Sequence, residues 1–153
     1  MRINKNTNYF LYSAGVLLII TAMAKLISAC GSSRILQNSD PVFAISFRSV
    51  FVIVGLLEMF VSAVCFFSSR LDFKACMVAL LTTNFFIYRL GLLLVGFHKP
   101  CSCMGNLTDA LHIPPQTADT VMKIILAYLL LGSYASLFWL WRQRKTTAIT
   151  PSN

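Results

Sequence analysis

Apolar residues along the chain gather into four long segments that shorter polar stretches separate. The segments cover residues 9–29, 46–67, 75–97 and 120–141. Each approaches or exceeds the roughly 20 residues that a helix needs to cross about 30 Å of hydrocarbon. A helix pairs its own backbone polar groups, so it is the expected spanning structure in lipid. The pattern predicts an all-α integral membrane four-helix bundle, with residues 1–145 as one domain and 146–153 as a flexible C-terminal tail.

Composition and charge agree with a membrane protein rather than a nucleic-acid-binding one. The chain is 57% hydrophobic and only 12% charged, about half the charged share of an ordinary soluble domain. Its net charge is +8, but the basic residues lie mainly at the ends of apolar segments and form no run. One predicted side of the bilayer is the richer in them, with Arg2, Lys5, Arg70, Lys74, Arg142, Arg144 and Lys145. The positive-inside rule then predicts an inner-membrane protein with both termini in the cytoplasm.

Two cysteines lie one residue apart in the polar loop before the fourth segment. Cys101 and Cys103 would be ~6.6 Å apart in an extended chain, near the upper limit for a disulfide. A bond between them therefore needs a turn, and a strained disulfide is readily reduced or exchanged. Lys99 would stabilise a thiolate in this loop, and Cys30 is a candidate resolving thiol on the same, periplasmic side. We interpret Cys101 and Cys103 as a catalytic thiol–disulfide pair.

Two other classes of function stay open. His98, Cys101, Cys103 and His112 could together bind a metal ion such as zinc, although their spacing is not that of a zinc finger. Alternatively, the chain could be a non-catalytic accessory subunit of a membrane complex, in which the thiols would be dispensable.

The first apolar segment also has some features of a lipoprotein signal. It ends in the sequence Ile27-Ser28-Ala29-Cys30, where cleavage would leave a lipidated cysteine. Against this interpretation, Lys25 interrupts the region that should be uniformly apolar. We therefore favour a membrane span here, with Cys30 at its outer end.

Three ionisable residues lie inside the predicted spans, namely Lys25, Glu58 and Arg89. Such residues are costly in lipid and usually face a partner in the bundle interior. Counting 1.5 Å per residue from the outer boundary puts Glu58 ~15 Å deep, Arg89 ~12 Å and Lys25 ~6 Å. We therefore expect Glu58 and Arg89 to pair, with Lys25 at the edge of the same polar network. This network could relay protons or hold the head group of a membrane quinone, or it could simply clamp the helices together.

On these features the chain resembles the MauE/DoxX family of redox-associated membrane proteins. The segment Pro100-Cys101-Ser102-Cys103-Met104-Gly105 is similar to that family's Cys-x-Cys-aromatic-Gly loop, with Met104 in place of the aromatic residue. Lys25 and Glu58 match the family's charged positions in the first two spans. The resemblance implies disulfide chemistry of the kind linked to methylamine utilisation, with a periplasmic thiol or thioredoxin-like partner. It identifies neither that partner nor a cofactor.

Overall fold

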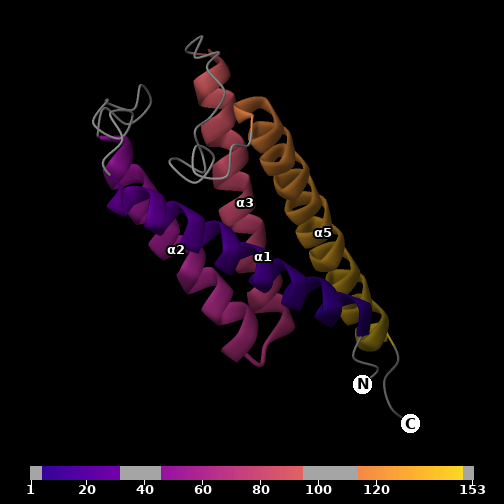
Figure 1. Ribbon diagram of the computed structural model, residues 1–153. Helices are drawn as coiled ribbons and strands as arrows, with labels where there is room; N and C mark the ends of the chain where they lie inside the picture. Colours follow the sequence, from indigo (N-terminus) through magenta and orange to yellow (C-terminus); the bar gives the residue numbers. More distant parts are fainter. Residues whose placement is uncertain (1–4, 32–45, 95–113, 150–153) are drawn as a thin grey trace.

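The computed structural model describes residues 5–31, 46–94 and 114–149, and these residues form four long helices (Figure 1). The helices are α1 (Lys5–Cys30), α2 (Phe47–Phe67), α3 (Leu71–Leu94) and α5 (Pro115–Ile149). All four are long and apolar enough to cross a membrane. The predicted all-α, four-span fold is therefore confirmed.

Local signals explain where α2 and α3 begin. The hydroxyl of Ser46 accepts a hydrogen bond from the amide of Ser49 at 3.3 Å, which caps the first turn of α2. α3 starts at Leu71, four residues before the predicted start at residue 75. Its first turn contains Asp72, whose negative charge is favourable at a helix N-terminus. The charged residues Asp72 and Lys74 in this first turn interrupt the apolar run by which the span was predicted.

The last helix extends beyond its apolar segment in both directions. Pro115 occupies the first helical position, where its missing amide costs no hydrogen bond. The helix then continues to Ile149, so residues 146–149 of the predicted flexible tail are helical. At 35 residues it is about 52 Å long, well above the ~30 Å of a hydrocarbon core. Part of this helix therefore extends beyond the hydrocarbon core.

The helices pack as two pairs, α1 with α2 and α3 with α5, and the contacts between the pairs are fewer. Small residues bring α1 and α2 close together. A Cβ atom added to Gly15 would lie 3.2 Å from the Cβ of Cys65, and one added to Gly55 would lie 3.0 Å from Leu26. This closeness allows the hydroxyl of Ser62 to donate a hydrogen bond to the Gly15 carbonyl at 2.8 Å. Small residues at helix interfaces are a general packing device in membranes.

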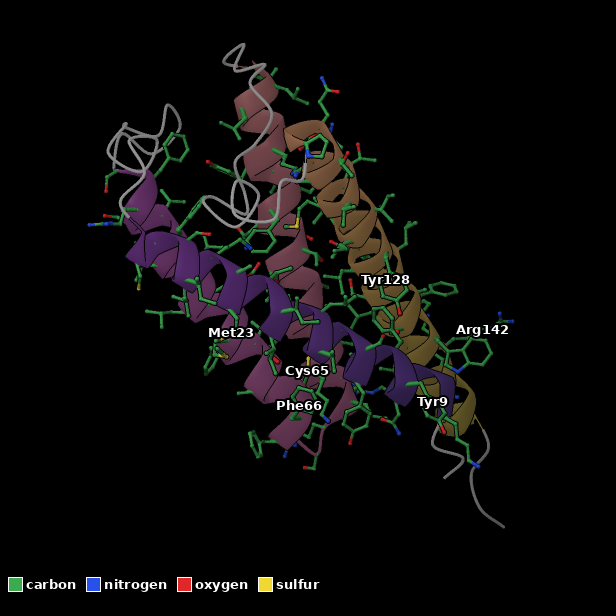
Figure 2. The ribbon with its side chains drawn as sticks, viewed as in Figure 1. Tyr9, Met23, Cys65, Phe66, Tyr128 and Arg142 are labelled. Atoms are coloured by element: carbon green, nitrogen blue, oxygen red, sulfur yellow. The ribbon has the colours of Figure 1, made fainter. Side chains whose placement is uncertain are left out.

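A core of buried side chains joins the two pairs in the half of the bundle nearer the termini. Its members come from all four helices: Leu11, Ala14, Leu18, Val61, Cys65, Ala75, Val78, Leu81 and Leu129. Cys65 lies among α1, α2 and α3 in this interior (Figure 2). α1 meets α5 here too, because the rings of Phe10 and Tyr128 pack edge to face with centroids 5.5 Å apart. From this contact the two pairs diverge toward the opposite end of the bundle (Figure 1).

The start of α1 and the end of α5 lie at the same end of the bundle, where Figure 2 shows Tyr9 and Arg142. Arg144 of α5 forms an exposed ion pair with Asp72 of α3. Lys145 lies over the ring of Trp141, 4.0 Å from its centroid. Arg144 and Lys145, two of the basic residues that the sequence assigns to the cytoplasmic side, thus lie together at this end of the bundle.

Candidate functional site

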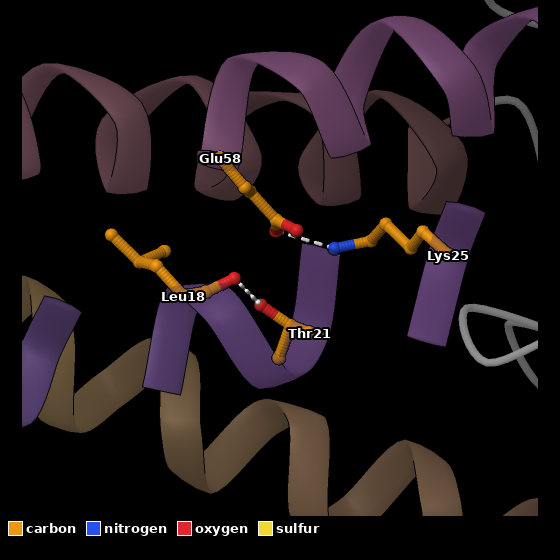
Figure 3. A network of polar contacts seen from close by, with 4 residues as sticks. All are labelled: Leu18, Thr21, Lys25 and Glu58. Atoms are coloured by element: carbon orange, nitrogen blue, oxygen red, sulfur yellow. Dashed lines mark hydrogen bonds and ion pairs between the residues drawn. The ribbon is translucent and has the colours of Figure 1, made fainter. Parts of the chain in front are cut away.

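A buried ion pair joins the first two helices. Lys25 of α1 extends toward α2 and donates to Oε1 of Glu58 (Figure 3). The side chain of Lys25 is 9% exposed and that of Glu58 only 2%. Because Cα–Cβ bonds tilt toward the helix N-terminus, the long lysine side chain leans deeper into the bundle than its backbone position suggests. The shallow lysine of α1 can therefore reach the deeper carboxylate of α2.

The surroundings of this pair are only partly polar. Lys25 Nζ lies 5.3 Å from the ring centroid of Phe85, which comes from α3 in the other helix pair. Thr21, one turn before Lys25, lies beside the carboxylate and donates its hydroxyl hydrogen to the carbonyl of Leu18 at 3.1 Å (Figure 3). The second carboxylate oxygen, Oε2 of Glu58, is buried and accepts no hydrogen bond. A buried oxygen of this kind is uncommon and marks a place where a donor group would be stabilised.

The third intramembrane charge has a different partner from the one expected. Arg89 of α3 pairs with Asp119 of α5 at 3.2 Å, and Lys123 joins the same carboxylate at 2.7 Å. The expected pairing of Arg89 with Glu58 is therefore wrong. Arg89 lies five residues before the end of α3 and Asp119 four residues after the start of α5, about 7.5 and 6 Å along their axes. The two charges are at one level on adjacent helices.

Asp119 is the ion-pair partner that sequence reasoning missed. It stands at the start of a predicted span, where an acidic residue is common because it favours a helix N-terminus. The one available signal was Lys123, four residues later on the same helix face. Only the packing of α3 against α5 shows that Arg89 shares this carboxylate.

The described cysteines occupy three different environments. Cys30 is exposed at the last residue of α1, Cys65 is fully buried in the core, and Cys76 is exposed on α3. None of these three forms a disulfide. The other candidate site residues lie outside the described residues: His98, Lys99, Cys101, Cys103 and His112. Within the described ranges, no group of three or more metal-binding side chains is found.

The end of the bundle that carries Cys30 is also the end that carries the two helix termini flanking the Cys-x-Cys segment in the sequence. α1 and α3 finish there, and α2 and α5 begin there (Figure 1). Arg48, in the first turn of α2, donates to the carbonyl of Gly31 at 2.8 Å and so satisfies a backbone group at the end of α1. This contact fixes the backbone next to Cys30 against the start of α2.

Four apolar helices, with two ion pairs inside the bundle, define a multi-pass membrane protein. Comparison with protein families identifies the family of membrane proteins to which it belongs. The model of methylamine utilisation protein MauE matches residues 5–142, which is nearly all of the chain. The chain belongs to the MauE family. Neither the curated proteins nor the solved structures contain a significant match to it.

Proposed function

We propose that this MauE-family protein is a thiol–disulfide redox protein of the inner membrane. In this proposal Cys101 and Cys103 exchange a disulfide with a thiol protein on the periplasmic side. Lys99 favours the thiolate form that attacks a disulfide, and Cys30 resolves the mixed disulfide. Residues 1–145 act as one membrane domain that presents these groups at its outer face.

One observation supports this proposal above the others. Cys30 is exposed and forms no disulfide, and it lies at the end of the bundle where α3 ends and α5 begins, the two helices that flank the Cys-x-Cys segment in the sequence. An exposed thiol at the border of a membrane span is available for exchange, whereas the buried thiol of Cys65 is not. The opposite end carries Arg144 and Lys145 together with the start of α1 and the end of α5, as expected for a cytoplasmic side.

Trapping of mixed disulfides tests the proposal directly. Cys101→Ala and Cys103→Ala, each made in cells together with Cys30→Ala so that the proposed resolving thiol is absent, should differ, because removing the second cysteine of an exchanging pair leaves the first attached to its partner. Cys76→Ala is the matched control, since Cys76 is also an exposed thiol but lies at the other end of the bundle. We expect one loop variant to accumulate a reducible complex with a periplasmic protein. If neither variant traps a partner and the loop thiols never change redox state, the exchange role is wrong.

The same cells separate the two alternative functions. A membrane-impermeant maleimide should label Cys30 and the loop thiols after reduction, and it should not reach Cys65. Protein that instead releases zinc or copper when His112→Ala is introduced would favour metal binding. If removing both loop cysteines left the phenotype of the intact protein unchanged, an accessory structural role would be favoured.

A further inference from the structure

A polar side chain near the middle of α3 lies on the outer surface of the bundle. Asn84 is exposed, about 20 Å from the start of α3 and about 15 Å from its end. One N–H of its amide group donates to the carbonyl of Leu80 at 2.9 Å. The second N–H and the amide oxygen have no partner among the residues that the structure describes. Because hydrocarbon offers no hydrogen bonds, these groups are uncompensated in a bilayer.

The neighbouring polar side chains of α3 are used inside the bundle instead. Thr82 is buried and donates to the carbonyl of Val78 at 2.9 Å. The hydroxyl of Thr83 lies 2.9 Å from that of Tyr134, so this contact joins α3 to α5. Asn84 differs from both, because its remaining hydrogen-bonding capacity lies on the surface that lipid covers.

Asn84 belongs to a row of residues that recurs at alternating intervals of four and three positions along α3. This spacing keeps a row on one face of a helix and is that of the contact seam in coiled coils. Buried residues such as Val78 and Thr82 lie on the opposite side of the helix. Five members of the row are exposed and two are half-buried. We call this row the α3 seam, and its members are Phe73, Met77, Leu80, Asn84, Ile87, Gly91 and Leu94.

The composition of the α3 seam suits contact with another helix. In heptad notation Asn84 and Gly91 occupy a positions, and Leu80 and Ile87 occupy the neighbouring d positions. Gly91 has no side chain to hold a second helix away, and Leu80 and Ile87 are large, exposed apolar residues. No member of the seam is charged, so two identical seams can meet without electrostatic repulsion.

We propose that the α3 seam binds α3 of a second copy of this chain. Copies in one membrane share one orientation, so a two-fold axis along the bilayer normal makes their α3 helices parallel. Each residue then lies at the same depth as its counterpart, and Asn84 meets Asn84 of the second copy. Each amide donates to the oxygen of the other, which compensates both. A single asparagine at an a position also fixes the register and the number of helices in a coiled coil.

Symmetry favours a second copy over an unrelated membrane protein. The uncompensated amide needs a partner at its own depth, and self-association supplies one without any further sequence feature. An amide carries both donors and an acceptor, so two identical asparagines are complementary, as two lysines or two glutamates are not. The seam contains no cysteine, so this inference is independent of the proposed thiol chemistry.

Dilution in phosphatidylcholine vesicles tests the dimer with the full chain. Chains that carry a donor or an acceptor dye at the C-terminus are mixed, and energy transfer is measured as the protein-to-lipid ratio falls. Asn84→Leu should need about tenfold more protein per lipid than the wild type for half-maximal dimerisation, because interhelical hydrogen bonds are lost. Phe86→Leu, an exposed position outside the seam, should match the wild type. A monomeric wild type, or Asn84→Leu that dimerises as readily as the wild type, would overturn the inference.

Cysteine crosslinking locates the interface while Asn84 is kept. The test chain retains the buried Cys65 and has its other four cysteines replaced by alanine. Ile87→Cys then places a thiol at a d position, where parallel helices are close enough for a disulfide, and Phe86→Cys places one on a different face. With a membrane-permeant oxidant, Ile87→Cys should form a covalent dimer and Phe86→Cys should not. Equal crosslinking, or none from either position, would refute this interface even if Asn84→Leu did not fold.

Discussion

Replacing the charges of Lys25 and Glu58 singly and together should give strongly non-additive effects on stability. Lys25→Met leaves the carboxyl group of Glu58 buried without its cationic partner. Breaking a buried ion pair from one side costs about 3–5 kcal/mol, because the remaining group has lost its compensation. Removing both charges with side chains of similar volume is often neutral or stabilising. The double variant should therefore be within about 1 kcal/mol of the wild type.

The two single variants should also differ from each other. In Glu58→Met the lysine keeps its position over Phe85, an interaction of about 0.5–2 kcal/mol, and its long side chain can bend toward the interface. The carboxyl group that remains in Lys25→Met is shorter and lies deeper in the bundle. We therefore expect Lys25→Met to be the less stable of the two single variants by about 1 kcal/mol.

Reversible unfolding in mixed lipid–detergent micelles, followed by circular dichroism, measures all four proteins under one condition. The coupling free energy of the double-mutant cycle should be at least about 2 kcal/mol in magnitude. Additive losses, with the double variant about as unstable as the sum of the singles, would falsify the reasoning. That result would mean that the ion pair contributes net stability over an apolar interface.

Three further substitutions test the packing and the remaining ion pairs. Gly15→Leu should separate α1 from α2 and cost about 1–3 kcal/mol in unfolding free energy, whereas Val16→Leu, on the exposed neighbouring face, should change it little. Asp119→Asn should lower the unfolding free energy by about 1–3 kcal/mol, a loss between those expected for an exposed and for a fully buried ion pair, because both side chains are partly buried. A variant in which Arg89 and Asp119 are exchanged should recover part of this loss. Arg144→Ala removes the exposed ion pair with Asp72 and should change the unfolding free energy by less than about 1 kcal/mol. A larger loss would show that this ion pair contributes more stability than surface ion pairs usually do.

Much of the fold could be predicted because hydropathy in lipid is a strong and local signal. Four apolar segments of spanning length require four helices, and Ser46 marks one helix start by its own side-chain chemistry. The helix ends outside the bilayer were less predictable. α5 continues through basic residues that are good helix formers and ends at Ile149. The next residue, Thr150, precedes Pro151, and a residue before proline is disfavoured in a helix.

The pairing of the intramembrane charges could not be predicted in the same way. Depth along a helix axis is read from residue count, but the direction in which a side chain points around and along that axis is not. By depth alone Glu58 and Arg89 were the natural partners. The structure instead joins Glu58 to Lys25 and Arg89 to Asp119.

The order of residues by itself determined that this chain crosses a membrane four times, that it carries a close thiol pair between its last two spans, and that charges lie inside the spans. Tertiary structure decided which charges meet, because α1 pairs with α2 and α3 with α5, and each ion pair forms within its own helix pair. It also decided that one oxygen of Glu58 stays without a donor. The reason is physical: burial of apolar residues depends on composition, whereas an ion pair depends on two atoms that only helix packing brings together.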